Sequence, residues 1–209
     1  MIVAILSESP ADEAALRVLV DGILKQKTFP AVPPFRILAR GWEAVLQRVP
    51  SFVKHLHFQT DAVGFLITLD SDHTTVHDET HERTPGGDKD CRLCKLIALI
   101  DETQGHLSAR PCGVPLKIAY GVAVPSIEAW YLANVEHGVS EAAWKSGAFP
   151  YTKPQLKEKA YGTSRPPLDD EQRLAVNHVR ALVESGKLEL LEQRFPAGFG
   201  TLAKCLRSW

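Results

Sequence analysis

Two aspartates end the most apolar stretch of the chain, which reads AVGFLITLDSD over Ala62–Asp72. A short continuous apolar run is typical of a strand that is buried on both faces of a parallel sheet. Such a strand would place Asp70 and Asp72 at the carboxyl edge of the sheet, where open α/β sheets bind ligands. Two close carboxylates repel each other unless a proton or a cation lies between them, and Mg²⁺ or Mn²⁺ suits an all-oxygen site. The structural alternative is that these aspartates cap a helix or form a turn.

Two further acids follow other expected strands. Glu8 comes just after the apolar run Ile2–Leu6, and Glu128 follows the run Leu116–Val124 in the first turn of the next expected helix. Glu13 lies one helical turn beyond the Glu8 loop. If the strands are neighbours in one sheet, these acids converge. Converging carboxylates can hold Mg²⁺ and leave its other positions to water and substrate phosphates.

The elements that must position these acids alternate along the chain, which predicts an α/β fold with a mostly parallel, Rossmann-like four-stranded sheet flanked by helices. The expected strands are Ile2–Leu6, Phe35–Ala39, Val63–Leu69 and Leu116–Val124. The expected helices between them are Asp12–Lys25, Trp42–Leu56 (interrupted at Pro50), Cys91–Leu107 and Ser126–Asn134. We expect Trp130 to pack in the core between helix and sheet.

The remainder of the chain differs in character. Trp144–Pro154 resembles a loop, and short helices separated by Gly and Pro are expected at Gln155–Tyr161, Asp169–Ser185, Lys187–Gln193 and Phe199–Leu206. We therefore divide the chain into an α/β domain over residues 1–137 and a helical C-terminal extension over residues 138–209 that packs on it.

A second group of metal-ligating residue types lies between the acids. Cys91 and Cys94 form a CxxC pair, and His73, His77 and His81 lie in the polar loop upstream of it. Two cysteines with two of these histidines can make a tetrahedral zinc site that would pin the loop. The alternatives are two packed thiols on one helix face and, less favoured by the context, a redox pair.

Two segments resemble the TOPRIM domain of topoisomerases, primases and overcoming-lysogenization-defect nucleases. SESPADEAAL is similar to the opening of the nuclease branch, with Ser9 in place of the usual Gly, and LDSD resembles the metal-binding motif. VAVPSIEAW and FPAGFGTLAKCL resemble segments of an uncharacterised bacterial TOPRIM-like family, domain-of-unknown-function family 4276. The resemblance implies a TOPRIM-like sheet and a divalent-metal-dependent nuclease.

The same resemblance implies roles for individual residues. Glu8, Asp70 and Asp72 would be the catalytic and metal-binding acids, and Glu128 and Glu13 would be further metal ligands. Such nucleases also need a basic group at the scissile phosphate. The candidates are Lys153, Lys157, Lys159 and Arg165, for which a solvated helix face is the alternative, and His73 is a further substrate contact or a surface residue.

Composition and missing motifs narrow the function. The 209 residues are 44% hydrophobic and carry a formal net charge of -1, which excludes a globally basic nucleic-acid binder. The chain has no P-loop, GxGxxG or nucleophile elbow, and four cysteines do not indicate a disulfide scaffold. We expect a cytoplasmic Mg²⁺- or Mn²⁺-dependent nuclease that acts on nucleic acid, DNA above all, without contact with a membrane.

Two expectations about partners and mechanism remain. The family resemblance suggests a role in defence against phage or plasmid DNA together with an ATPase partner. The alternative function is a non-catalytic TOPRIM-like module that binds nucleic acid or protein, with a structural zinc at the CxxC pair.

Overall fold

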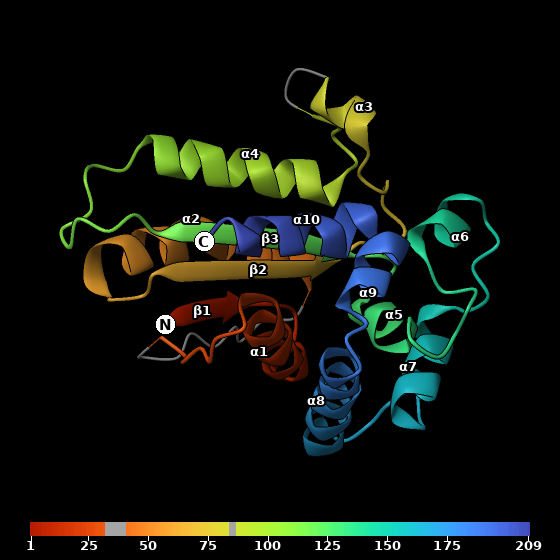
Figure 1. Cartoon of the computed structure of the whole chain (residues 1–209). Helices are drawn as coiled ribbons and strands as arrows, with labels where there is room; N and C mark the ends of the chain where they lie inside the picture. The colour runs from red at the N-terminus through yellow and green to blue at the C-terminus, as the bar shows by residue number, and fades with distance from the viewer. Residues whose placement is uncertain (32–40, 84–86) are drawn as a thin grey trace.

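The fold is an α/β sandwich around a small parallel sheet (Figure 1). The computed structural model describes residues 1–31, 41–83 and 87–209. Within them, the strands β1 (Val3–Leu6), β2 (Gly64–Asp70) and β3 (Lys117–Ala123) pair in parallel in the order β1-β2-β3. The α/β class is therefore confirmed. The fourth expected strand, Phe35–Ala39, lies outside the described residues, so a four-stranded TOPRIM sheet stays a prediction.

The register of the sheet decides which residues meet at its carboxyl edge. Leu6 at the end of β1 pairs with Ile67, and Asp70 at the end of β2 pairs with Ala123 at the end of β3. The chain after β1 therefore continues alongside the last residues of β2, as the sequence predicted for Glu8. The central position of β2 also explains its continuous apolar pattern, since six of its seven residues are buried.

Two layers of helices cover the sheet. On one face, α2 (Trp42–Gln59) packs on β2 and α4 (Arg92–Gly105) packs on α2 and β3. On the other face, α1 (Pro10–Leu24) packs on β1 and α10 (Thr201–Arg207) packs on β3 (Figure 1). The expected interruption at Pro50 is wrong, because α2 runs through this residue. Burial of the apolar face of α2 outweighs the hydrogen bond that proline removes.

The remaining helices connect or extend this sandwich, and all except the 17-residue α8 are short. They are α3 (Glu79–Glu82), α5 (Ile127–Leu132), α6 (Glu141–Lys145), α7 (Lys153–Tyr161), α8 (Leu168–Glu184), α9 (Leu188–Arg194) and the π-helical turn η1 (Pro196–Gly200). The loop expected over Trp144–Pro154 is shorter than predicted, because α6 ends and α7 begins within it. Ser140 caps α6, and Thr152 forms a capping box with Gln155 at α7.

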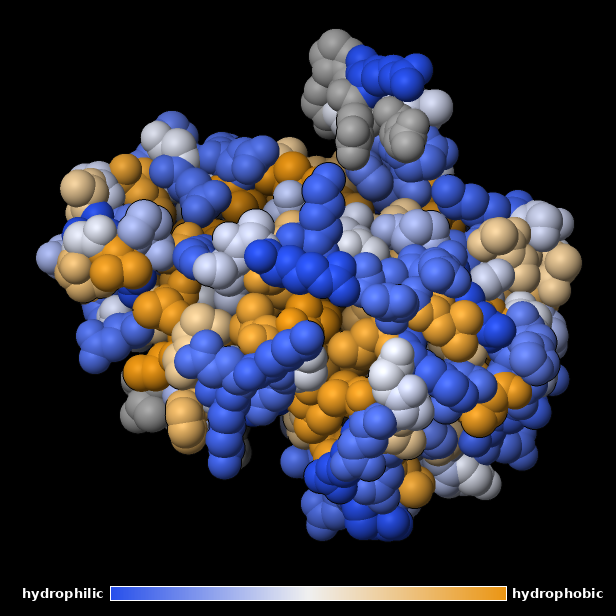
Figure 2. Space-filling view, viewed as in Figure 1, coloured by the Kyte–Doolittle hydropathy of each residue, from blue (hydrophilic) through white to orange (hydrophobic). Residues whose placement is uncertain are grey.

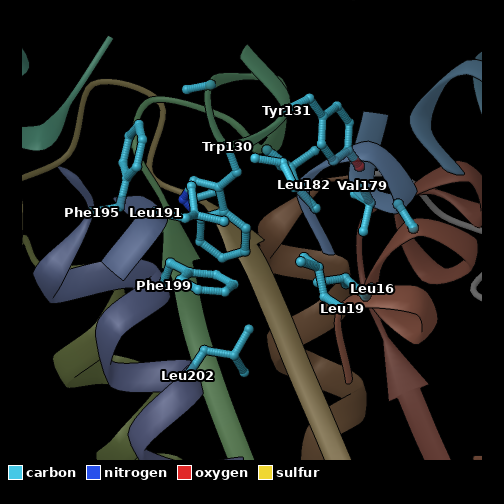
Figure 3. Packing of buried hydrophobic residues seen from close by; sticks show 14 of the residues in the cluster. Leu16, Leu19, Trp130, Tyr131, Val179, Leu182, Leu191, Phe195, Phe199 and Leu202 are labelled. Atoms are coloured by element: carbon cyan, nitrogen blue, oxygen red, sulfur yellow. The ribbon is translucent and has the colours of Figure 1, made fainter. Parts of the chain in front are cut away.

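The helical extension shares its core with the α/β part. Leu16 and Leu19 of α1 lie in one buried cluster with Val179 and Leu182 of α8, as Figure 3 shows. Trp130 is fully buried in this cluster, as expected. Its ring meets Phe199 edge to face at 5.3 Å. The α7–α8 segment is thereby held beside the carboxyl edge of the sheet.

The surface is mixed in polarity. Hydrophilic side chains cover most of the face seen in Figure 2, and hydrophobic side chains appear in its middle as separate patches. None of the helices in the described ranges combines the length and apolar character that a membrane crossing requires.

Candidate functional site

The two aspartates of LDSD lie in a turn that the neighbouring strand holds in place. Asp70 ends β2, and the backbone N–H groups of Ser71 and Asp72 donate to the carbonyls of Ala123 and Pro125 at 2.7 and 2.9 Å. Asp72 adopts a left-handed conformation with φ of 51°, which aspartate tolerates better than most residues. The turn therefore fixes both carboxylates at the carboxyl edge of the sheet.

Glu8 joins this turn from β1. Its Oε1 accepts a hydrogen bond of 2.9 Å from the backbone N–H of Asp70. Ser9 has an extended backbone with φ of -146° and caps α1 by accepting from the N–H of Asp12 at 3.1 Å. Serine at the usual glycine position is thus compatible with the geometry, because no positive φ is needed there. Burial is the main reason why the pKa of Glu8 is raised.

Both carboxylate oxygens of Asp70 accept hydrogen bonds. Its Oδ1 accepts from the N–H of Ile127 at 3.0 Å, and its Oδ2 accepts from Lys153 Nζ at 2.9 Å. Burial raises the pKa of Asp70 to about 7, with Glu128 and Glu8 adding to the rise and Lys153 opposing it. Near neutral pH this carboxyl is therefore poised between its protonated and ionised forms.

Lys153 joins the two aspartates of the turn. Its ammonium donates to Asp70 and to Asp72 Oδ1, while Arg92 Nη1 lies 2.7 Å from Asp72 Oδ2. Burial raises the pKa of Asp72, but the hydrogen bonds from Lys153 and Arg92 outweigh it and the net pKa is lowered. Burial opposes the charge of Lys153, yet the two aspartates raise its pKa. Lys153 thus occupies the place between the aspartates that the sequence assigned to a cation.

A second acid–lysine group adjoins the first. Glu128 is nearly buried, accepts from Ser126 Oγ at 2.6 Å and lies 3.5 Å from Lys157 Nζ. Lys157 also lies 3.2 Å from Glu171 on α8. Because Lys153 and Lys157 are four residues apart on α7, they share one helix face. This face turns both ammonium groups toward the acids at the strand ends.

Asp12 and Glu171 are acids of this site that sequence reasoning missed. Burial raises the pKa of Asp12 well above its usual value, and Asp70 and Glu128 raise it further. The sequence carried a usable signal for Asp12. It is the third residue after the cap Ser9 and therefore lies in the first turn of α1, beside Glu8. Glu171 follows α7 in the chain and reaches the site only because α8 packs on α7. Its sequence context carries no such signal.

The contacts of three other expected site residues differ from the predicted ones or leave the prediction open. Burial lowers the pKa of Arg17, and Asp21 and Glu13 oppose this effect, while the role of Glu13 as a metal ligand stays a prediction. His73 is exposed and stacks on Trp144, with ring centroids 6.0 Å apart. Lys159 pairs with Glu136 at 2.8 Å on the surface.

Arg165 is the last basic candidate. It is exposed, and its backbone N–H is 3.4 Å from Thr163 Oγ1. The solvated alternative thus fits Lys159 and Arg165, whereas Lys153 and Lys157 lie at the acids.

We call the whole assembly the carboxylate site. Its acids outnumber its cations by six to three, and it consists of Glu8, Asp12, Asp70, Asp72, Glu128 and Glu171 with Arg92, Lys153 and Lys157. Burial is the main reason why the pKa values of Glu8, Asp12 and Asp70 rise, and the neighbouring acids raise them further. The buried hydroxyls of Tyr131 and Tyr161 have no hydrogen-bond partner among the described residues. Burial raises the pKa of both hydroxyls, and the acids of the site raise it further. An all-oxygen donor set with spare polar atoms fits a hard divalent cation.

The cysteines and histidines form a separate group, which we call the thiol–imidazole cluster. Its ligand atoms, from His77, His81, Cys91 and Cys94, all lie within 4.8 Å of one another. In the described part of the chain, this is the group of three or more His, Cys, Asp or Glu side chains whose ligand atoms lie close enough together to hold one metal ion. Two thiols and two imidazoles are typical of zinc rather than of Mg²⁺.

Comparisons with known proteins complete the description of the site. Neither the protein-family models, nor the curated proteins, nor the solved structures contain a match to this chain. The TOPRIM resemblance and the roles that it implies therefore stay predictions.

Proposed function

We propose that the chain is a divalent-metal-dependent nuclease that cleaves phosphodiester bonds at the carboxylate site. The observation that carries this proposal is the gathering of acids from three strand ends opposite two lysines of α7. Carboxylates alone would suit a structural cation. Carboxylates together with ammonium groups at one sheet edge suit a ligand that brings both a metal ion and a phosphate.

Asp70, Asp72 and Glu8 are the residues that would hold Mg²⁺ or Mn²⁺, with Glu128 and Asp12 as further oxygen donors nearby. When bound, such an ion supplies activation of water and stabilisation of the leaving oxygen. The turn after β2 and the Asp70 N–H to Glu8 bond pre-position three of these carboxylates. Their geometry therefore does not depend on a loop that must first become ordered.

Lys153 and Lys157 are the groups that would contact the substrate phosphate. Lys153 balances Asp70 and Asp72, and Lys157 balances Glu128 and Glu171. Lys153 donates to carboxylate oxygens of Asp70 and Asp72, the residues that would hold the ion, so Lys153 would have to release some of these oxygens to it. The displaced ammonium would then be available to an anionic phosphate, as would Lys157 one helical turn away.

The pKa of Asp70 links this function to pH. With a pKa of about 7, Asp70 is half protonated near neutrality and fully ionised only above it. A proton and a metal ion compete for this carboxylate. We therefore expect activity and metal affinity to increase from pH 6 to pH 8.

One observation favours the alternative of a non-catalytic binding module. Lys153 and Arg92 already neutralise Asp72, so the turn can persist without a metal ion. In that case the lysines would serve nucleic acid or a protein partner directly. A role in phage or plasmid defence with an ATPase partner rests on the family resemblance alone.

A cleavage assay tests the proposal. We would incubate the wild type with single- and double-stranded DNA and RNA in the presence of Mg²⁺ or Mn²⁺, and compare it with Asp70→Asn/Asp72→Asn. Loss of metal ligands should reduce cleavage by on the order of 100-fold or more. The matched control is Asp170→Asn, a half-exposed aspartate that pairs with Arg173 on the surface.

Two outcomes would overturn the proposal. One is equal cleavage by the wild type and the double variant. The other is an absence of metal-dependent cleavage of all four substrates by the wild type. Retained nucleic-acid binding in the second case would support the binding module.

A further inference from the structure

We propose that His77, His81, Cys91 and Cys94 bind one structural zinc ion, which fastens the loop after β2 to the first turn of α4. This assignment goes beyond the proposed nuclease function and does not depend on it. The ligands are the Nδ1 atoms of both histidines and the Sγ atoms of both cysteines.

Three sulfur–nitrogen distances in the cluster match those of a tetrahedral zinc site. His77 Nδ1 lies 3.4 Å from Cys94 Sγ and 3.6 Å from Cys91 Sγ, and His81 Nδ1 lies 3.7 Å from Cys94 Sγ. Zinc bonds of about 2.3 Å to sulfur and about 2.0 Å to nitrogen, in tetrahedral directions, place a sulfur and a nitrogen about 3.5 Å apart. The four atoms are thus already arranged around a point that one zinc ion can occupy.

Ordinary hydrogen bonding explains the cluster less well. His77 Nδ1 has one lone pair in its neutral form and can accept from a single thiol, yet both sulfurs lie close to it. Both cysteines and His81 are buried, so these polar groups have little access to water. Zinc satisfies all four ligand atoms at once.

Two carboxylates lie near the other ring nitrogen of His81, at distances longer than a hydrogen bond. Its Nδ1 faces Cys94, while its Nε2 lies 3.6 Å from Asp88 Oδ2 and 3.9 Å from Asp78 Oδ1. Zinc-bound histidines usually donate their other ring N–H to a carboxylate, which fixes the tautomer and the ring orientation. Asp78 accepts a hydrogen bond of 2.9 Å from the backbone N–H of Thr80, and Asp88 accepts one of 3.1 Å from the backbone N–H of Cys91.

The local chain is built to bring the ligands together. Cys91 is the N-cap residue of α4, and Cys94 follows one turn later on the same helix. Gly87 approaches Cys94 closely with φ of 70°, and a Cβ atom there would lie 2.8 Å from that of Cys94. Four protein ligands leave no open position, so the site is structural rather than catalytic.

The position of the cluster gives this zinc a consequence for the carboxylate site. Arg92, the residue after Cys91, pairs with Asp72 and lies over the ring of Trp42 at 4.8 Å. A zinc ion that fixes Cys91 therefore also fixes the start of α4 that carries Arg92. The functional importance of this link to Arg92 rests on the proposed function, whereas the metal assignment rests on the ligand geometry.

Metal content tests the assignment directly. We expect the full chain, purified under reducing conditions without chelator, to contain one zinc per chain by elemental analysis. Cys91→Ser/Cys94→Ser should lower the zinc content at least tenfold. The matched control Cys112→Ser/Cys205→Ser removes the two cysteines outside the cluster and should retain zinc. An absence of zinc in the wild type, or equal loss in both double variants, would overturn the proposal.

Cobalt substitution keeps the test decisive if the cysteine variant does not fold. Co²⁺ added to metal-free wild type should produce intense visible bands of a tetrahedral thiolate site, and an equimolar amount of Zn²⁺ should abolish them. Weak bands of an octahedral oxygen site would overturn the zinc assignment. Because neither readout uses nuclease activity, and because Asp70→Asn/Asp72→Asn should retain both, failure of the zinc site is distinguishable from failure of the carboxylate site.

Discussion

The carboxylate site and the thiol–imidazole cluster meet at the start of α4, where Arg92 pairs with Asp72 and follows Cys91, yet they are built in different ways. The carboxylate site takes oxygen ligands from residues as far apart as Glu8 and Glu171, and its own cations Lys153 and Arg92 already balance part of its charge. The thiol–imidazole cluster takes its four ligands from residues 77–94, and its ligand atoms already lie within 4.8 Å of one another. The difference teaches that closed ligand geometry and excess charge are separate signs of metal binding.

The two sites should therefore respond differently to metal removal. A closed zinc site contributes to folding, because its ligands are assembled only in the folded chain. An open carboxylate site that its own lysines partly neutralise contributes to ligand binding instead. We therefore expect loss of the zinc ligands to act mainly on stability, and changes at the carboxylate site to act mainly on ligand binding and activity.

The largest effect on stability should follow loss of the zinc ligands. Cys91→Ser/Cys94→Ser should lower the midpoint of thermal unfolding by on the order of 10 °C, because the loop after β2 loses its attachment to α4. Asp70→Asn/Asp72→Asn should change this midpoint less, because the turn after β2 keeps its backbone hydrogen bonds to Ala123 and Pro125. Scanning calorimetry of both variants checks the contrast, and an equal effect of the two would contradict it.

Loss of Lys153 should affect activity more than stability. Lys153→Met removes the ammonium between Asp70 and Asp72 and should reduce cleavage by about 10- to 100-fold. Lys159→Met is the matched control, because Lys159 lies on α7 as Lys153 does but pairs with Glu136 on the surface. Kinetics at several Mg²⁺ concentrations measure the effect. A Lys153 variant that cleaves as fast as the control would remove this lysine from the proposed mechanism.

Stability should fall as pH rises through the titration of Asp70. Because its pKa of about 7 in the folded chain exceeds the ordinary value of 3.8, the folded state binds more protons between these pH values. The free energy of unfolding should therefore decrease by at most about 4 kcal/mol from pH 4 to pH 7 and stay level above. Denaturant titrations of wild type and Asp70→Asn measure this.

The Asp70→Asn variant should show a smaller decrease over the same range, since asparagine does not titrate. The pKa of Glu8 and that of Asp12 are raised too, so part of the slope should persist. An unchanged slope in the variant would show that Asp70 is not the group responsible.

The smallest effect is expected for Glu13. Glu13→Gln should change cleavage less than twofold, because Glu13 acts on the pKa of Arg17, whereas Glu8 and Glu128 act on that of Asp70. Asp12→Asn, one residue earlier, should reduce metal affinity by about tenfold. Metal titrations of the two variants compare them, and the reverse order of effects would restore Glu13 as a ligand.

Sequence reasoning succeeded where the determining interactions are local. The apolar run of β2 and the expected convergence of Glu8 with Asp70 were both correct, because strand burial and parallel pairing leave a clear pattern. The residue types of Cys91, Cys94 and the upstream histidines indicated a possible zinc site, and the structure gathers His77 and His81 with both cysteines, while zinc binding itself stays a prediction. The interruption of α2 at Pro50 was wrong because tertiary packing overrides the local penalty.

What the sequence by itself determined is therefore the sheet edge and its first carboxylates. Only the tertiary structure decided that Lys153 reaches Asp70 across 83 positions of the chain, and that Asp12 and Glu171 join the same site. The physical reason is that helix periodicity defines the face on which Lys153 and Lys157 lie, but not the surface that this face meets. The packing of α7 and α8 against α5 and α1 makes that choice, through buried side chains that are distant in sequence.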